Sequence, residues 1–469
     1  MNYIFLDTES SGSSTVWDQV LEIGMVWTDE KLNIKEKWEM RSRIKDGIVP
    51  NLGALEVTGF TVKDLTQSNN SHMQMVEAME NTLKRWGNAY VFAYNGQNFD
   101  YPLIQKTMYK SLKPAYITNT NGKKHGDVLN IIRAAKLVNP DVIETPMSDS
   151  GNPIFKLDKL MKHEGAHGAM SDSLAMLEVA KKAYVNANSV WRASLLTISK
   201  ADTEEVITKH KLFCQLQWFY GRLRKYLVTH FMFHPVYHAW AQTWDLRHRP
   251  EDFFKLDDAS LKQALSKSPK ILRTLKANKS EIILNHKHVL TESPYKELGE
   301  AELARRAVVL HDNFEFKKRI KKILQDVNDE RMAKSIKDDK ILYPEEMLYA
   351  KGFPKDEDKN LMNFFHQFKW EDRVELIDKF KEERFSKLAE KLIYEEKPEV
   401  LPEGITKRVK REIAERIFST DKQTWTTLPE FYRQIDEKRS KHENDKKKMK
   451  LLDEYDHFAQ NIEKKYESA

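Results

Sequence analysis

The alternation of apolar and polar positions near the N-terminus predicts the strands of a sheet. Residues 3–6 form a short apolar run, residues 20–28 form a longer run of strand-forming side chains, and residues 36–44 alternate between the two kinds. A turn at 28–33 separates the last two segments. Three successive strands with short links predict an antiparallel meander.

Helical spacing of the apolar positions takes over after this meander. The pattern predicts, in chain order, a helix at 71–86, a strand at 90–94, a helix from about 101, a short strand or helix start at 127–129, and a helix at 171–186. Strands and helices in this arrangement are typical of a mixed α/β domain. We expect this domain to span residues 1–186, which is within the usual size range.

The rest of the chain predicts two further domains. Residues 187–341 hold aromatic runs and few glycines, and we expect them to mix short strands with helices. Residues 342–469 are charged and helix-patterned, most clearly at 373–394, 407–417 and 446–466. A chain of 469 residues is too long for one ordinary core, so several domains are expected.

Composition narrows the class of protein only slightly. The formal charge of +6 comes from 77 basic and 71 acidic residues, so net charge alone does not identify a nucleic-acid-binding protein. Cys214 is the only cysteine, which excludes an intramolecular disulfide and a cysteine-based zinc site. A reducing, cytoplasmic location is therefore expected.

The apolar runs also predict a soluble protein with no membrane contact. None of them approaches the roughly 20 residues that a membrane-spanning helix needs. The first run ends in Asp7 after only a few residues, which is typical of a strand and not of a signal peptide.

Four carboxylates occupy positions where a folded α/β domain places ligands. Asp7 and Glu9 are two residues apart at the end of the first strand, so they point to the same face. Asp100 follows the fourth predicted strand after a short polar turn. Asp172 lies in the first turn of the last helix of this domain, which Ser171 or Asp172 could cap.

Such carboxylates suit a site for two divalent metals. Their hard oxygen atoms favour Mg²⁺, with Mn²⁺ as a substitute, and these ions usually share their coordination with substrate phosphates. Two ions about 4 Å apart would serve phosphodiester hydrolysis. His167, five residues before Asp172, could take the proton from the attacking water, because its ordinary pKa near 6.5 suits a base at neutral pH.

Each of these features has a simpler interpretation when it stands alone. An Asp-x-Glu pair after a strand is more often a solvated loop start, and a histidine near a helix start is more often a surface or capping residue. The order of the features is more specific than any one of them.

That order resembles the DEDD superfamily of 3′→5′ exonucleases, in the subgroup with a histidine five residues before the last aspartate. A tyrosine four residues before it would mark the other subgroup, and that position is Gly168. Beyond the superfamily, the chain resembles bacterial exonuclease I. The similarity covers nearly the whole chain and is carried by residues 52–59, 127–133, 155–160 and 167–175.

The resemblance implies a fold, a metal site and a base. The expected architecture is an RNase H-like exonuclease domain at 1–186, an SH3-like α+β middle domain at 187–341 and an α-helical C-terminal domain at 342–469. Asp7, Glu9, Asp100 and Asp172 match the metal ligands, and His167 matches the general base.

The resemblance also implies contacts with the substrate. Thr8 and the loop at 54–58 would border the terminal nucleotide, Glu9 would also bind the substrate, and Arg133 falls at a DNA-contact position. Lys156 stands where the family has an arginine, and Gln105 replaces another expected arginine. Because lysine offers a point charge in place of a bidentate fork, we expect a looser contact at Lys156.

The predicted function is therefore a magnesium-dependent exonuclease that degrades single-stranded DNA from the 3′ end to nucleoside 5′-monophosphates, in DNA repair or recombination. A monomer is expected, with the acidic C-terminal tail of single-stranded DNA-binding protein as a partner. An RNA exonuclease or a proofreading exonuclease is one alternative. A non-catalytic single-strand-binding protein is another, but its expected signature is the loss of a carboxylate, and all four are present.

Two other sequence features have both a functional and a structural interpretation. Trp218, Phe219 and Tyr220, followed by Arg222, Arg224 and Lys225, could line a path for single-stranded DNA, but we favour a place in the core of the middle domain for these aromatics. The basic clusters at 407–411 and 446–448 are expected to be solvated helix faces.

Overall fold

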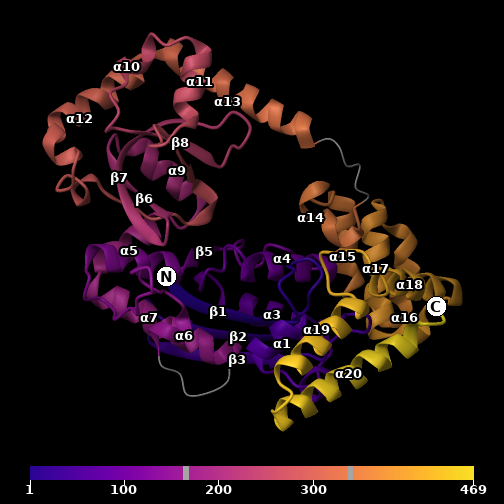
Figure 1. Cartoon of the computed structure of the whole chain (residues 1–469). Coiled ribbons are helices and arrows are strands. Elements are labelled where there is room, and N and C mark those ends of the chain that lie inside the picture. The colour runs from indigo at the N-terminus through magenta and orange to yellow at the C-terminus, as the bar shows by residue number, and fades with distance from the viewer. Residues whose placement is uncertain (162–167, 336–341) are drawn as a thin grey trace. The chain divides into compact units, whose positions relative to one another are not determined.

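The computed structural model describes residues 1–161, 168–335 and 342–469 (Figure 1). The chain divides into two compact units, which interleave along the sequence. Unit 1 comprises residues 1–123, 163–174 and 341–469, and unit 2 comprises residues 124–162 and 175–340. The division into three domains at 186 and 341 stays a prediction.

Unit 1 is built on a mixed sheet. The strands β1 (Asn2–Ser10), β2 (Val20–Thr28) and β3 (Ile34–Arg41) are antiparallel, and β4 (Ala89–Ala93) runs parallel to β1. Their order in the sheet is β3-β2-β1-β4. The predicted three-strand meander and the mixed sheet are therefore confirmed.

Helices α3 (His72–Trp86) and α4 (Asp100–Lys110) share a core with these strands. Ser71 begins α3 with a capping box, in which Ser71 and Gln74 exchange hydrogen bonds between side chain and backbone. The apolar stripe of α3 is buried in the same cluster as Ile4 and Leu6 of β1. This packing fixes the first strand, which carries the first two carboxylates.

Residues 342–469 form the second part of unit 1, and all their regular elements are helical. These are η3 (Pro344–Glu346), α14 (Met347–Ala350), α15 (Asp356–Phe365), α16 (Trp370–Arg373), η4 (Val374–Lys379), α17 (Glu383–Glu396), η5 (Pro398–Val400), α18 (Glu403–Ile417), α19 (Leu428–Lys441) and α20 (Lys446–Tyr466).

These C-terminal helices share one apolar core with short helices near the N-terminus. Helix α1 (Leu52–Thr58) and helix α2 (Val62–Thr66) place Leu55 and Leu65 in the same cluster as Phe385 of α17 and Tyr455 of α20. The Tyr455 hydroxyl donates a hydrogen bond to the backbone carbonyl of Phe60 at 2.5 Å. Burial of this shared surface explains why segments over 300 residues apart in sequence form one unit.

Unit 2 is organised around an antiparallel five-stranded sheet in the order β10-β6-β7-β8-β9. Its strands are β6 (Phe213–Phe219), β7 (Arg222–Phe233), β8 (Trp240–Asp245), β9 (Leu272–Lys276) and β10 (Ile283–Asn285). The expected mixture of short strands and helices is confirmed, whereas the SH3-like character stays a prediction.

The other elements of this part of the chain are mostly helices. They are β5 (Lys123–Asp127), α5 (Val128–Val138), α6 (Leu157–Leu160), α7 (Ala169–Asn186), α8 (Asn188–Leu196), α9 (Lys200–Lys209), α10 (Glu251–Phe254), α11 (Asp258–Ser266), η1 (Ala277–Lys279), η2 (His286–His288), α12 (Tyr295–Asp312) and α13 (Phe314–Ser335). The first residues of α7 belong to unit 1. Among the described residues, no helix is long and apolar enough to cross a membrane.

Candidate metal centre

Three carboxylates from two distant segments meet in unit 1. Asp7 and Glu9 lie on β1, and Asp172 lies in the first turn of α7. Each offers an oxygen atom, and these oxygens all lie within 4.8 Å of one another. The structure therefore brings together three of the four residues that the sequence predicts as metal ligands.

Asp100 adjoins this group and is held by a neighbour of the first two ligands. It begins α4, is 5% exposed, and accepts a hydrogen bond of 2.7 Å from the Thr8 hydroxyl. Burial raises the pKa of Asp100 to about 6, although the bond from Thr8 acts in the opposite direction. Thr8 is itself buried, so its hydroxyl is committed to positioning Asp100.

The carboxylates of this cluster repel one another. Burial raises the pKa of Asp7 well above its ordinary value, and the charges of Asp100, Glu9 and Asp172 raise it further. Burial, followed by Asp172, raises the pKa of Glu9 to about 8. Buried like charges at this separation are favourable only when protons or cations neutralise them. The donor set fits hard divalent cations such as Mg²⁺ or Mn²⁺.

Glu22 on β2 is a further carboxylate of this region, which the sequence interpretation missed. It is fully buried opposite Glu9 in the sheet and forms an ion pair with Arg41 of β3. One of its oxygens accepts a hydrogen bond of 3.0 Å from the backbone N–H of Ala169. The sequence does contain one sign of this role, namely a glutamate inside the apolar run at 20–28. A charged side chain in a buried strand needs an ion-pair or hydrogen-bond partner.

The start of α7 differs from the prediction. The helix begins at Ala169, so Ser171 and Asp172 lie inside it and neither caps it. Glu22 supplies the acceptor for the first N–H group, so no local cap at 171 or 172 is needed. The predicted place of Asp172 in the first turn is confirmed.

Gly24 allows this helix start to approach the sheet. A β-carbon at Gly24 would lie 2.3 Å from the carbonyl carbon of Ala169 and 2.4 Å from the nitrogen of Met170. The Ser173 hydroxyl donates to the Gly24 carbonyl at 2.9 Å. The lack of a side chain at Gly24 and the bond from Ser173 together place Asp172 near β1.

The predicted substrate contacts differ in their surroundings. Gln105, in unit 1, is buried and accepts a hydrogen bond of 2.6 Å from the Tyr349 hydroxyl. In unit 2, the guanidinium of Arg133 lies 3.9 Å from the centre of the Trp218 ring, and Lys156 is exposed at the start of α6. Their contacts with substrate stay predictions. His167 lies outside the described residues, so its role as the base also stays a prediction.

The aromatic run at 218–220 is not part of the core, so the expectation favoured above is wrong. Strands β6 and β7 pair as far as Phe219 and Arg222, and the two residues between them form a tight hairpin turn. Tyr220 is 91% exposed, Phe219 40% and Trp218 36%. The core of this sheet lies further along the strands, around Phe213 and Val228, and at the hairpin Trp218 contacts Phe155 with the ring centres 6.1 Å apart.

Comparison with known proteins identifies the class to which this arrangement belongs. Residues 342–462 match the family described as Exonuclease I C-terminal domain. Exonuclease I from Methylocaldum szegediense has a TM-score of 0.82 at 19% identity, covering 98% of this chain and 99% of that one. Exonuclease I from E. coli in complex with a dA16 oligonucleotide has a TM-score of 0.81 at 18% identity, with the same coverage. The chain has the exonuclease I fold.

A curated relative is also similar in sequence. The chain is 28% identical over 188 residues to exodeoxyribonuclease I from Buchnera aphidicola subsp. Schizaphis graminum, and the match covers 39% of each chain. The chain thus matches about two fifths of the length of this curated relative. A solved complex described as SSB/Exonuclease I with an inhibitor has a TM-score of 0.78 at 18% identity. The predicted resemblance to bacterial exonuclease I is confirmed.

Proposed function

We propose that the chain is an exonuclease that hydrolyses single-stranded DNA from its 3′ end and releases nucleoside 5′-monophosphates with the help of two divalent cations. The observation that carries this proposal is the close grouping of the Asp7, Glu9 and Asp172 carboxylates in a chain with the exonuclease I fold. A protein that merely bound DNA would have no reason to bury like charges beside one another.

The proposed mechanism assigns a separate task to each residue. Asp7, Glu9 and Asp172 would hold the cations, with Asp100 fixed nearby by Thr8. When bound, the cations would supply charge stabilisation to the phosphodiester in its transition state. Glu22 holds the start of α7 and so orients Asp172. His167 would take the proton from the attacking water.

Replacement of Asp172 tests the assignment of the site. Asp172→Ala should abolish cleavage of an end-labelled single-stranded oligonucleotide at saturating Mg²⁺ while the chain stays folded by circular dichroism. The control is Glu178→Gln, on the same helix but with its side chain 50% exposed, which should keep full activity. Full turnover by Asp172→Ala would contradict the proposal.

The alternative functions differ from this one in the nucleic acid that is cleaved, or in that the protein binds DNA without cleaving it. A timed digest of matched single-stranded DNA, double-stranded DNA and RNA labelled at either end reports polarity and substrate together. Preferential loss of RNA would favour the RNA exonuclease. Binding without any cleavage by the wild-type chain would favour the non-catalytic binding protein.

We also propose that the exposed hairpin at 218–222 is a stacking platform for the DNA bases. Arg133 packs against Trp218, and Arg222 donates to the backbone carbonyl of Gly151 and to the side-chain Oδ1 of Asn152, so charge accompanies the exposed rings. Aromatic rings beside cations bind single strands without reading their sequence.

Alanine substitution at the hairpin measures this contribution. Tyr220→Ala and Trp218→Ala should each weaken binding of a single-stranded oligonucleotide by about 1–3 kcal/mol, the usual value of one stacked base. The control is Phe314→Ala, another aromatic of unit 2, which is 63% exposed and lies outside the hairpin. Equal binding by all three variants would rule out the platform.

The partner and the biological setting belong to the same proposal. The solved SSB/Exonuclease I complex supports binding of single-stranded DNA-binding protein by this chain. Its acidic C-terminal tail is the predicted contact. A monomer, a cytoplasmic location and a role in DNA repair or recombination stay predictions, and light scattering of the purified chain would test the first.

A further inference from the structure

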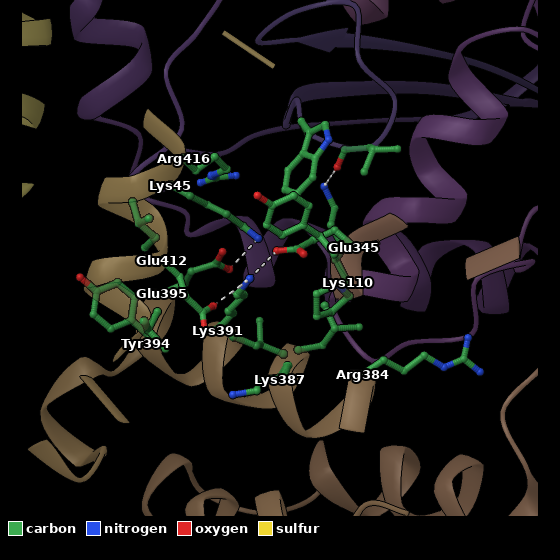
Figure 2. Close-up of a pocket in the computed structure, with 18 of the residues that line it drawn as sticks. Lys45, Lys110, Glu345, Arg384, Lys387, Lys391, Tyr394, Glu395, Glu412 and Arg416 are labelled. Atoms are coloured by element: carbon green, nitrogen blue, oxygen red, sulfur yellow. Dashed lines mark hydrogen bonds and ion pairs between the residues drawn. The ribbon is translucent and has the colours of Figure 1, made fainter. Parts of the chain in front are cut away.

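A cavity of about 700 Å³ lies within unit 1, away from the metal centre. Its walls come from residues 16–19, from Lys45 and Lys110, and from helices α17 and α18 with the turn η3 before them. A volume of this size is in the range of sites for small organic ligands. Figure 2 shows a group of charged side chains that converge on its centre.

The charged groups on one side of the cavity neutralise one another. Lys45 pairs with Glu395 at 2.6 Å, and Lys391 pairs with Glu345 at 2.9 Å and with Glu412 at 3.4 Å. These dashed contacts are drawn in Figure 2, where Arg384 extends away from the network. Apart from the Oε2 atom of Glu345, these paired groups need no ligand.

Two further cations line the cavity, and each is held by a backbone carbonyl. Lys110 donates to the backbone carbonyl of Val16 at 2.6 Å, and Arg416 donates to the carbonyl of Gly47 at 2.8 Å. Neither lies within 4.0 Å of a carboxylate among the described residues. Burial, followed by the charge of Lys45, lowers the pKa of Lys110 to about 8, although the charges of Glu345, Glu395 and Asp18 act in the opposite direction.

Aromatic rings and unpaired polar atoms also line the cavity. Arg416 lies 5.4 Å from the centre of the Trp17 ring, and Trp17 lies 5.2 Å from Tyr343. Trp17, His72 and Glu345 are all more than nine-tenths buried and line the cavity. The Nε1 of Trp17, the Nδ1 of His72 and the Oε2 of Glu345 have no hydrogen-bond partner among the described residues. Such atoms are rare in folded proteins unless a ligand or solvent satisfies them.

We propose that this cavity binds a nucleoside 5′-monophosphate, with the phosphate between Lys110 and Arg416, the base beside Trp17 and Tyr343, and a sugar or base donor at Glu345. Cations suit the phosphate, an aromatic wall suits the base, and a carboxylate oxygen suits a hydroxyl or amino group. The same class of molecule is the product of the proposed hydrolysis, but the assignment rests on the side chains of the cavity alone.

Calorimetry on the full chain tests the proposal. The probe is 2′-deoxyadenosine 5′-monophosphate in the presence of EDTA, which removes metal-dependent binding at the carboxylates of β1. One molecule per chain should bind, and deoxyadenosine or inorganic phosphate alone should bind at least tenfold more weakly. Lack of saturable binding at millimolar nucleotide would overturn the proposal.

Variants locate the binding. Lys110→Met and Glu345→Gln should each weaken the affinity at least tenfold, whereas Lys110→Arg should retain most of it. Lys407→Met, whose side chain on α18 is 75% exposed, is the matched control and should bind normally. Nucleotide binding that survives Lys110→Met but disappears with Asp172→Ala would place the ligand at the metal centre and refute the cavity site.

Hydrogen exchange of the wild-type chain tests the same proposal without relying on the variants, some of which could fail to fold. Bound nucleotide should slow exchange in η3 and α18, and protection confined to β1 and the start of α7 would contradict the proposal. Nuclease assays are read separately. A chain that binds nucleotide through Lys110 but cleaves no DNA refutes the proposed function alone, and an active chain without such binding refutes this inference alone.

Discussion

Two charged regions of unit 1 differ in how their charges are balanced. At the metal centre, the carboxylates of Asp7, Glu9 and Asp172 lie close together, and the neighbouring Glu22 forms an ion pair with Arg41. In the cavity near α17, each carboxylate of the central network has an ammonium partner. The first region gathers like charges, whereas the second pairs opposite charges.

The pKa shifts in the two regions run in opposite directions for this reason. Burial and neighbouring carboxylates raise the pKa of Glu9 to about 8. Burial would also raise the pKa of Glu345, but Lys391 holds it below its ordinary value. A buried carboxylate is thus a sign of a metal site only where the chain offers it no cation of its own.

The largest expected effect is the loss of a metal ligand. Asp7→Asn keeps the shape of the side chain but removes one negative charge from the cluster. Activity on single-stranded DNA should fall by more than about 100-fold, because even the loss of a partner behind the ligands costs roughly 10–100-fold. Initial rates over a range of Mg²⁺ concentrations would measure it, and a rate within threefold of wild type would show that Asp7 is not a ligand.

Metal binding should stabilise the folded chain through the metal centre and not through the cavity near α17. At Mg²⁺ concentrations of about 100 times the dissociation constant, binding should raise the free energy of unfolding by about 2.7 kcal/mol. Thermal melts with and without Mg²⁺ should therefore show a higher Tm with metal for the wild type and little change for Asp7→Asn. Lys391→Met, in the cavity, should keep the full shift, and loss of the shift in that variant would contradict the separation of the two regions.

Gly24→Ala tests how closely the start of α7 must approach the sheet. The added methyl group would overlap the backbone of Ala169 and Met170, so the helix start must move. We expect a loss of about 1–3 kcal/mol in the free energy of unfolding, typical of overpacking, together with reduced activity because Asp172 moves with the helix.

Gly404→Ala is the matched control for this change. It lies in α18 with no atom near the position of a new β-carbon, so stability should stay the same or rise slightly. Urea unfolding and the nuclease assay report the two effects separately. Wild-type activity in Gly24→Ala would mean that the helix start does not fix the position of Asp172.

The local sequence pattern predicted the helices and strands well. It could not predict features that depend on residues far apart in the sequence. The bounds of β2 at 20–28 follow from the apolar run alone, and α3 begins where Ser71 caps it. The start of α7 could not be predicted because its cap is Glu22, almost 150 residues away. The same holds for the cavity, which joins Trp17 and Lys110 to Arg416.

Runs of charged and aromatic residues show the same limit of prediction from sequence, because their exposure depends on where the fold places them. In the cluster at 407–411, Lys407 and Arg411 are exposed as expected, whereas Arg408 forms an ion pair with the buried Glu390 of α17. The run at 218–220 is exposed although aromatic runs are usually buried, since a two-residue turn places it at the tip of a hairpin. Composition could not reveal that turn position, which depends on the register between β6 and β7.

The smallest expected effect is at the ion-paired side of the cavity. Lys45→Met removes the partner of Glu395, and the two side chains are only 12% and 21% exposed. The loss should be about 1–2 kcal/mol, between the roughly 0–1 kcal/mol of a surface pair and the 3–5 kcal/mol of a fully buried one. Urea unfolding would measure it against Lys407→Met, whose exposed pair should contribute almost nothing. Nuclease activity should be unchanged in both variants, because the cavity and the metal centre are separate. A fall of tenfold or more in Lys45→Met would show that the two regions act together.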